Sequence, residues 1–139
     1  MAVFSEGFKV ETSGNSDIID ITPQVTELVA LSGMCNGIVL VYVPGSTAAI
    51  TTIEFEPGLI RDMKAALERL APQGITYHHN ERWHDGNGHS HIRASFLGQG
   101  ESFPLVDGTI LLGTWQQVIL IDLDNRPRSR KVLVQVCGE

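Results

Sequence analysis

Residues 36–43 read Asn-Gly-Ile-Val-Leu-Val-Tyr-Val, and no other stretch says more about the fold. The run is nearly all apolar and rich in β-branched side chains, which favour an extended backbone over a helix. A strand of this composition is typical of the middle of a sheet, where neighbouring elements cover its side chains. We therefore expect residues 36–43 to form a central strand, and the other elements are placed around it.

Further strand-like segments lie on both sides of this central strand. In chain order they are residues 4–11, 17–21, 47–53, 116–123 and 128–137, and the chain from Gly88 onward is expected to hold only strands and turns. Asp107-Gly108 stands between two apolar runs, which predicts a hairpin. Residues 124–127, Asp-Asn-Arg-Pro, join the last two strands and predict a second hairpin.

Two segments have the spacing of helices. The first begins near Thr22, which is suited to capping, has a proline at its first helical position and ends at Gly33. The second begins at Pro57 and ends before Pro72, and its apolar residues recur at helical spacing. We expect about seven to nine strands, mostly antiparallel because their connections are too short for crossovers. The pattern predicts an α+β fold, a small β-sandwich of two sheets with two helices, in one domain over residues 1–139.

The charge balance excludes some classes of partner. The chain has 16 acidic residues against 10 lysines and arginines, a net charge of −6, and its basic residues are scattered apart from a group at residues 126–131. Nucleic-acid binding needs a basic face, so we expect no such partner. No apolar run approaches the roughly 20 residues that span a bilayer, and the first residues lack the features of a secretory signal. We expect a cytoplasmic protein with no membrane partner.

The stretch Asn87–Phe96, Asn-Gly-His-Ser-His-Ile-Arg-Ala-Ser-Phe, holds most of the groups that could do chemistry. Interpreted as a strand, it places His89, His91 and Arg93 on one face and mainly apolar side chains on the other. Two histidines at positions i and i+2 of a strand stand about 7 Å apart, so their rings can converge on one ion.

All five histidines lie between residues 78 and 91. Neutral imidazole is a common ligand of transition metals, so a His-x-His pair with a third histidine from a nearby loop predicts a Zn²⁺ shell with an open position for water. The alternatives are that the pair is solvated, lies in an interface or binds an anion. Arg93 on the same face would bind an anionic group or form a salt bridge at an interface.

Three other segments are candidates for the same site. Glu54 follows the strand at 47–53 and is interpreted as a base, as a partner of a histidine, or as a charge at the start of the next helix. Ser46 and Thr47 lie in a small polar loop that is suited to holding a phosphate, although such triplets also occur in ordinary turns. Trp115 follows a glycine bulge that would aim the indole into a cleft, and the alternative is a tryptophan of the core.

Several motifs occur together across nearly the whole chain. They are Ser46-Thr47-Ala48-Ala49-Ile50, Glu54, Tyr77-x-His79, Asn87-Gly88-His89-Ser90-His91, Asp107-Gly108, Leu112-Gly113-Thr114-Trp115-Gln116 and Arg126-Pro127-Arg128. In this order they resemble the YjbQ family, whose members are often labelled secondary thiamine-phosphate synthase-like proteins. The Asn-Gly-His-x-His and Gly-Thr-Trp-Gln stretches are distinctive together.

The resemblance implies a small β-sandwich with two helices that assembles as a homotrimer. It also implies a cytosolic protein whose relatives form thiamine phosphate weakly from a pyrimidine pyrophosphate and a thiazole phosphate, with release of pyrophosphate. His79, His89 and His91 match the family pattern, whereas the other two histidines do not. Two positions depart from that pattern, since many members have a histidine where this chain has Gly45 and an aspartate where it has Asn80.

The leading hypothesis is a thiamine-phosphate-forming transferase whose catalytic residues are Glu54, His79 and His91. In this scheme a divalent metal, Zn²⁺ or Mg²⁺, lies at His79, His89 and His91. A small phosphorylated metabolite is held by Ser46, Thr47, Arg93 and Trp115. A second hypothesis keeps the site and makes the reaction a metal-dependent hydrolysis, because a shell of three histidines is suited to activating water. A third is a metabolite-binding trimer without catalysis.

Overall fold

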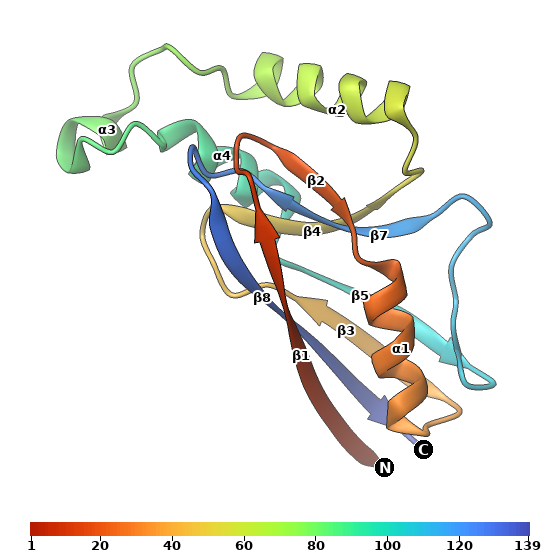
Figure 1. Cartoon of the computed structure of the whole chain (residues 1–139). Coiled ribbons are helices and arrows are strands. Elements are labelled where there is room, and N and C mark those ends of the chain that lie inside the picture. The colour runs from red at the N-terminus through yellow and green to blue at the C-terminus, as the bar shows by residue number, and fades with distance from the viewer.

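Eight strands and four helices follow one another in the computed structural model, which describes residues 1–139. In chain order they are β1 (Ala2–Thr12), β2 (Asp17–Asp20), α1 (Thr22–Ser32), β3 (Gly37–Tyr42), β4 (Ala48–Ile53), α2 (Pro57–Leu70), α3 (His78–Trp83), α4 (Gly88–Leu97), β5 (Gly100–Val106), β6 (Thr109–Ile110), β7 (Gln117–Asp122) and β8 (Arg128–Gly138). The strands form two antiparallel sheets, with the orders β1-β8-β3-β5-β6 and β2-β7-β4 (Figure 1). The predicted α+β sandwich is confirmed, with four helices instead of two.

The central position predicted for residues 36–43 is confirmed by β3, which pairs with β8 on one side and with β5 on the other. Its side chains alternate between two environments. Val39 and Val41 have no exposed surface, whereas Ile38 is 58% exposed. The strand is therefore central within its sheet but covered on one face only.

The main core lies between the two sheets. Cross-strand neighbours Phe4, Val136, Val39 and Phe103 form one row of the larger sheet, because residues opposite each other in register point to the same face. This row faces the smaller sheet, which contributes buried residues of β4 and β7, and α1 closes one end of the layer. The sandwich is a rigid platform, so loops at its ends are held in defined positions.

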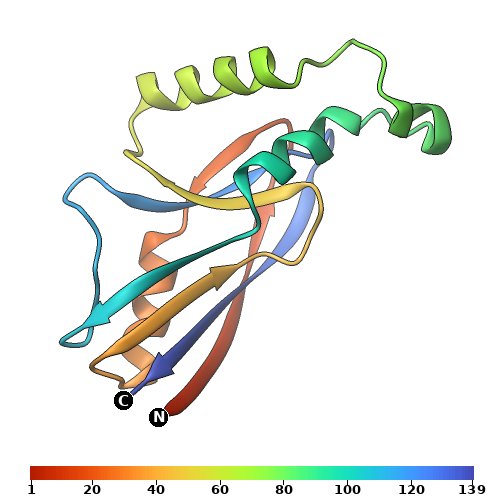
Figure 2. The same cartoon turned by 180° about the vertical axis from the view of Figure 1, so that it is seen from behind.

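Helices α2 and α4 cover the outer face of the smaller sheet (Figure 2). Ile119 and Ile121 point from that sheet to the helices and meet Leu67 of α2 and Ala94 of α4 in a second core. The start of α4, the loop before β4 and the connection after β7 all lie at the same end of this sheet, because they are joined by hydrogen bonds. Polar residues from three segments that are distant in the sequence, Thr47, Asn87 and Asp124, therefore lie close together there.

The segment Asn87–Phe96 is a helix and not the predicted strand. The buried residues of α4 include His89, Ser90, Arg93 and Ala94, and this spacing belongs to one face of a helix. A short alternation of polar and apolar residues fits either structure, so the pattern was ambiguous. On a helix, positions i and i+2 lie about 200° apart around the axis, so the two histidines of α4 point to opposite sides.

The connection from β7 to β8 is not the predicted hairpin. β7 belongs to the smaller sheet and β8 to the larger one, so the chain crosses between the sheets here. Asp122 at the end of β7 bonds to Thr12 and Arg130 of the larger sheet. The Asp107-Gly108 hairpin is confirmed, since both turn residues have positive φ, 49° and 77°, as a tight two-residue turn requires.

Candidate functional site

His79 on α3 and His91 on α4 lie side by side, with ring centroids 4.4 Å apart and ring planes tilted by 53°. The reversal between the two helices brings them together. His84 ends α3 in the left-handed conformation, with φ of 58°. The chain then passes so close to Tyr77 that a Cβ on Gly88 would lie 2.5 Å from the Tyr77 Cβ, and only glycine allows this approach.

Two side-chain oxygens lie close to one nitrogen of the His79 ring. Its Nε2 lies 3.0 Å from Asn87 Oδ1 and 3.5 Å from Asp85 Oδ1. The same end of the Asn87 amide lies 2.9 and 3.2 Å from the two carboxylate oxygens of Asp85. One ring nitrogen, one carboxylate oxygen and one amide oxygen thus form a small triangle. We call His79, Asp85, Asn87 and His91 the histidine cluster.

The Asn87 amide lies between two carboxylates. One end faces Asp85, and Nδ2 at the other end lies 3.3 Å from Asp124 Oδ1. In this orientation Nδ2 donates to Asp124 and Oδ1 faces Asp85. With the amide turned over, its nitrogen instead donates to both Asp85 oxygens and to His79 Nε2, so without a cation the turned orientation makes more hydrogen bonds. Either way, one carboxylate oxygen meets the amide oxygen, and two acceptors in contact repel each other. A positive charge on the Asp85 side would turn that repulsion into attraction.

Asp124 has no exposed surface and is ionised in the fold. Burial by itself raises the pKa of this carboxyl, but hydrogen bonds outweigh burial and lower the pKa from 3.8 to about 2. The donors are Arg128, the backbone N–H of Asn125, Asn87 and Thr47. Asp124 accepts a hydrogen bond from Asn87 only when the amide oxygen is turned toward the histidine cluster, so Asp124 and Asp85 compete for the amide nitrogen.

A second buried ion pair lies beside Asp124. Arg130 donates through Nε and Nη2 to both oxygens of Asp122 at 2.9 Å, and through Nη2 to Thr47 Oγ1 at 2.8 Å. Thr47 Oγ1 in turn donates to Asp124 at 3.0 Å. Every fully buried side-chain nitrogen and oxygen has a partner, so this network is satisfied and rigid. Ser46, the residue before Thr47, is exposed.

The two histidines of α4 have different surroundings. Burial lowers the pKa of His91, and the neighbouring His79 lowers it further, which leaves His91 neutral at pH 7 and able to accept a proton. His89 is only 4% exposed and lies on the other side of the helix, with Nε2 3.4 Å from Ser90 Oγ. Burial and the charge of Arg93 lower the pKa of His89. The predicted ligand set of His79, His89 and His91 is therefore not assembled in this chain.

Arg93 does not reach the histidine cluster. Its buried guanidinium donates to the carbonyl of Ala71 at 3.0 Å, to Ser16 Oγ at 3.1 Å and to Glu68 Oε2 at 2.7 Å. Each of its three nitrogens has an acceptor; Glu68 and Ala71 lie at the end of α2, and Ser16 lies in the turn before β2. Arg93 therefore ties α4 to the end of α2 and to the turn before β2, and it has no nitrogen left for a substrate.

Glu54 and Trp115 lie at the opposite end of the smaller sheet from the histidine cluster. From Thr47, β4 runs for six residues, about 20 Å at 3.3 Å per residue, before it reaches Glu54. Trp115 is 70% exposed in the loop between β6 and β7, and the next residue, Gln116, donates to Thr52 Oγ1 at 3.1 Å near that far end. Neither side chain joins the histidine cluster of its own chain.

The histidine cluster can supply three metal ligands only if the Asn87 oxygen is one of them. No three side chains drawn only from His, Cys, Asp and Glu group closely enough to bind a metal. His79 and Asp85 supply two such donors, and the Asn87 oxygen supplies the third. A cation at this position would therefore be held by one imidazole, one carboxylate and one amide.

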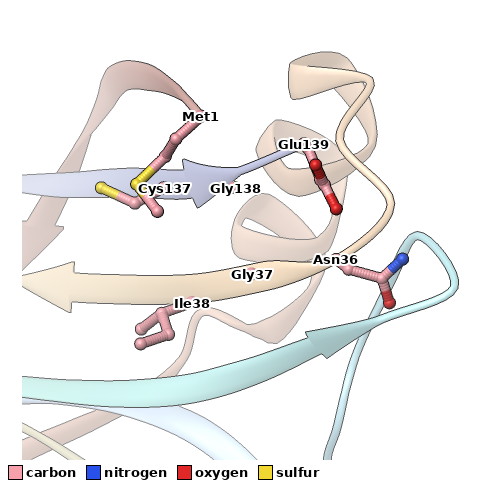
Figure 3. Close-up of a pocket in the computed structure, with 7 residues that line it drawn as sticks. All are labelled: Met1, Asn36, Gly37, Ile38, Cys137, Gly138 and Glu139. Carbon is pink, nitrogen blue, oxygen red and sulfur yellow. The ribbon is translucent and has the colours of Figure 1, made fainter.

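The largest pocket lies elsewhere. It has a volume of about 560 Å³ and is lined by Met1, Asn36, Gly37, Ile38, Cys137, Gly138 and Glu139 (Figure 3). It lies where the two chain ends meet, at the end of the larger sheet remote from α3 and α4 (Figure 1). Its lining has no histidine or arginine, and its titratable side chains are those of Cys137 and Glu139. None of the helices has the length and apolar character needed to cross a membrane.

The sequence interpretation missed Asp85, Asn87, Asp124 and Arg130. A signal was available in the repeated spacing Asp122-x-Asp124, followed by Arg128-x-Arg130. Arg128 and Arg130 are two apart on β8 and share a face. They pair with Asp124 and Asp122, so the two pairs neutralise each other. The short connection between the two pairs predicted a hairpin, and a hairpin gives no reason to expect the four side chains to be paired inside the protein.

Known proteins share this two-sheet sandwich with two helices on its smaller sheet. The family model for the UPF0047 protein YjbQ-like family matches residues 6–139, and the chain belongs to this family. A UPF0047 protein of Methanothermobacter thermautotrophicus is 37% identical over 139 residues, which are 100% of this chain and 95% of that protein. The resemblance predicted from the motifs is confirmed.

Solved structures share the fold closely. A YbjQ-like protein of unknown function from Sulfolobus solfataricus is 36% identical, with a TM-score of 0.94 over 99% of both chains. A protein of the YjbQ/UPF0047 family from Clostridium acetobutylicum is 35% identical, with a TM-score of 0.87 over 95% of this chain and 99% of that chain. These relatives establish the family and the fold, and their names state no reaction.

Proposed function

We propose that this protein is a metal-dependent enzyme that hydrolyses a small phosphorylated metabolite at the histidine cluster. The triangle of His79 Nε2, Asp85 Oδ1 and Asn87 Oδ1, with sides of 3.0, 3.5 and 2.9 Å, carries the proposal. Ligands about 2.1 Å from a divalent ion stand about 3 Å apart in octahedral geometry and about 3.4 Å apart in tetrahedral geometry. A mixed set of one imidazole and two oxygens suits Zn²⁺ or Mn²⁺ better than Mg²⁺.

The residues around the triangle have separate roles in this scheme. A divalent cation held there would supply a Lewis acid and favour ionisation of a bound water. His91, neutral and in contact with His79, accepts the proton of the attacking water as a general base. Asp124 acts through Asn87, because its hydrogen bond keeps the amide oxygen turned toward the cluster.

A second reaction, the formation of thiamine phosphate, stays a prediction from the resemblance. Arg128 favours it, since this partly exposed guanidinium beside Asp124 would neutralise a leaving pyrophosphate. One assay separates the two reactions. A hydrolase releases phosphate from the pyrimidine pyrophosphate alone, whereas a transferase needs the thiazole phosphate as well. Binding of either compound without turnover would indicate a metabolite-binding protein.

Metal binding is the first test of the proposed function. Tag-free protein is stripped with EDTA, reloaded with Zn²⁺ or Mn²⁺ and analysed for metal content after gel filtration. We expect about one ion per chain in the wild type and loss of the ion in His79→Ala and Asp85→Asn. His78→Ala is the matched control, because His78 is the exposed neighbour of His79 and contacts only Glu81.

The same measurement separates the observed cluster from the ligand set predicted from the sequence. His89→Ala is expected to keep its metal, because His89 is buried on the far side of α4. A wild type without bound metal, or an equal loss in His78→Ala, would overturn the assignment. Metal loss in a folded His89→Ala variant as well as in His79→Ala would restore the predicted set.

We also infer that the protein assembles as a homotrimer through the outer face of the larger sheet. Val3, Cys137, Ile38 and Pro104 form an apolar row across this face, in register from β1 to β5. The pocket of Figure 3 opens beside the row, and a second copy of the chain would cover both. Light scattering should give the mass of three chains for the wild type and a smaller mass for Ile38→Lys. A monomeric wild type would exclude the assembly.

A further inference from the structure

Arg130 has one guanidinium nitrogen without a partner in the chain. Its Nε and Nη2 donate to Asp122 and Thr47, whereas Nη1 donates to no group of the protein. No fully buried side-chain nitrogen or oxygen lacks a partner, so Nη1 is open to the outside, although Arg130 as a whole is only 9% exposed. The guanidinium is thus a fixed cation with one end turned outward.

Gly45 makes the opening through which this nitrogen is reached. A Cβ built on Gly45 would lie 3.0 Å from Arg130 Nη1 and would meet no other heavy atom within 4 Å. The backbone of Gly45 is not in the left-handed region, so its conformation does not require glycine. What the missing side chain provides is space directly in front of Nη1.

We propose that Gly45, Ser46 and Arg130 form a subsite for the phosphate group of a small molecule. With no side chain on Gly45, a phosphate oxygen in contact with the Gly45 Cα could approach Nη1 to about 3 Å, the length of a charge-assisted hydrogen bond. The exposed hydroxyl of Ser46, which bonds to no group of the chain, offers a second donor to the same ligand. Because Asp122 already fixes the guanidinium, binding would cost little side-chain entropy.

The surrounding charges allow an anion to bind with modest affinity. Arg128 and Arg130 balance the buried carboxylates Asp122 and Asp124, so the network as a whole neither attracts nor repels an anion strongly. Asp122 lies on the Nε and Nη2 edge of the guanidinium, away from Nη1. The ligand would therefore meet donors first, and we expect a dissociation constant in the millimolar range, about −4 kcal/mol of binding free energy.

The subsite and the histidine cluster are two parts of one end of the molecule. Thr47, which follows Ser46, bonds to Asp124, and Asp124 bonds to Asn87 of the cluster. A molecule anchored by its phosphate at Gly45 would extend toward His91. That this molecule is the substrate rests on the proposed function, whereas the binding of phosphate does not.

The test is titration of metal-free protein with inorganic phosphate in EDTA, followed by calorimetry and by ³¹P NMR. Wild type is expected to bind, and Gly45→Ala to bind at least ten-fold more weakly, because its methyl group would lie 3.0 Å from Nη1 and block the approach of a phosphate oxygen. Gly113→Ala is the matched control: Gly113 also lacks a left-handed backbone, and its Cβ would make only ordinary contacts of 3.6 and 3.7 Å with Gln116. Urea unfolding of each variant confirms that it is folded.

Two further binding measurements test whether the subsite prefers phosphate and whether it is separate from the histidine cluster. Acetate should bind more weakly than phosphate, because it offers fewer oxygens to Nη1 and Ser46, and His79→Ala should bind phosphate as the wild type does. A wild type that does not bind phosphate, a Gly45→Ala variant that binds it unchanged, or a loss in His79→Ala would each overturn the subsite. Phosphate binding that is lost in Gly45→Ala, in a protein that takes up no metal, would support the subsite while the proposed function fails.

Discussion

Replacing Asp124 by asparagine tests the buried charge network that holds the candidate site. The pKa of Asp124 is about 2 in the folded protein, against an ordinary value of 3.8. A lowered pKa means that the unfolded chain binds the proton more tightly, so the stabilisation is full above about pH 5 and is lost as the pH falls toward 2. At about 1.4 kcal/mol per pH unit, the ionised form contributes roughly 2 kcal/mol to folding. The Asp124 side chain has no exposed surface, so solvent screens little of this contribution to the free energy of folding.

Urea unfolding of the wild type and of Asp124→Asn between pH 2 and pH 7, in EDTA, measures the effect. At pH 7 we expect the variant to be less stable by about 3–5 kcal/mol, because Arg128 and Thr47 lose an ionised acceptor inside the protein. The difference should shrink by about 2 kcal/mol between pH 5 and pH 2, because only the wild type has this carboxyl to protonate. A ¹³C titration of the Asp124 carboxyl should show a midpoint near pH 2.

Asp62→Asn is the matched control for the Asp124 experiment. Asp62 is exposed on α2 and accepts no hydrogen bond from the chain, so its replacement should change stability little at any pH. A stability difference for Asp124→Asn that stays constant from pH 7 to pH 2 would refute the reasoning. A wild-type carboxyl midpoint close to 3.8 would refute it as well.

Three further changes test the roles of residues that the sequence placed in the site. His89→Ala should lower the free energy of unfolding by about 1–3 kcal/mol, because it empties a buried position, while the bound metal measured by elemental analysis stays unchanged. Arg93→Met should lower it by about 2–4 kcal/mol in urea unfolding, because two buried acceptors lose their donor, whereas Glu68→Gln, at the half-exposed end, should lower it by less than about 1 kcal/mol. Trp115→Ala should keep its metal and change the free energy of unfolding by less than about 0.5 kcal/mol, because the indole is 70% exposed. Metal loss in Trp115→Ala would instead mean that a partner chain brings this residue to the histidine cluster.

The sandwich could be predicted from local patterns because the composition of most strands, and the turn residues beside them, identify them in the sequence. Residues 36–43 are nearly all apolar and rich in β-branched side chains, a composition that favours a strand in the middle of a sheet, and β3 forms there. Asp-Gly is a pair that readily adopts positive φ at both positions, as a two-residue hairpin turn requires, and Asp107 and Gly108 do so. The error at α4 has the opposite cause, since His89, Ser90, Arg93 and Ala94 fit a helical face as well as an alternating strand. Over ten residues, only the packing of α4 against β4 decides between the two structures.

The histidine cluster could be predicted only in part, because its assembly depends on contacts between distant segments. His79 and His91 were identified by residue type, but their proximity comes from a left-handed turn at His84, a conformation that histidine rarely signals in a sequence. Asp124 near the end of an apolar strand is typically a surface residue, and it is buried here because the chain crosses between the sheets and brings two arginines back beside it. In place of a hairpin, that crossing produces a neutral layer of hydrogen-bonded carboxylates and guanidiniums between the sheets. A buried network between sheets is therefore indicated in a sequence by two aspartates and two arginines, each pair two residues apart, on either side of a short connection. A functional site should be sought among the residues beside such a network.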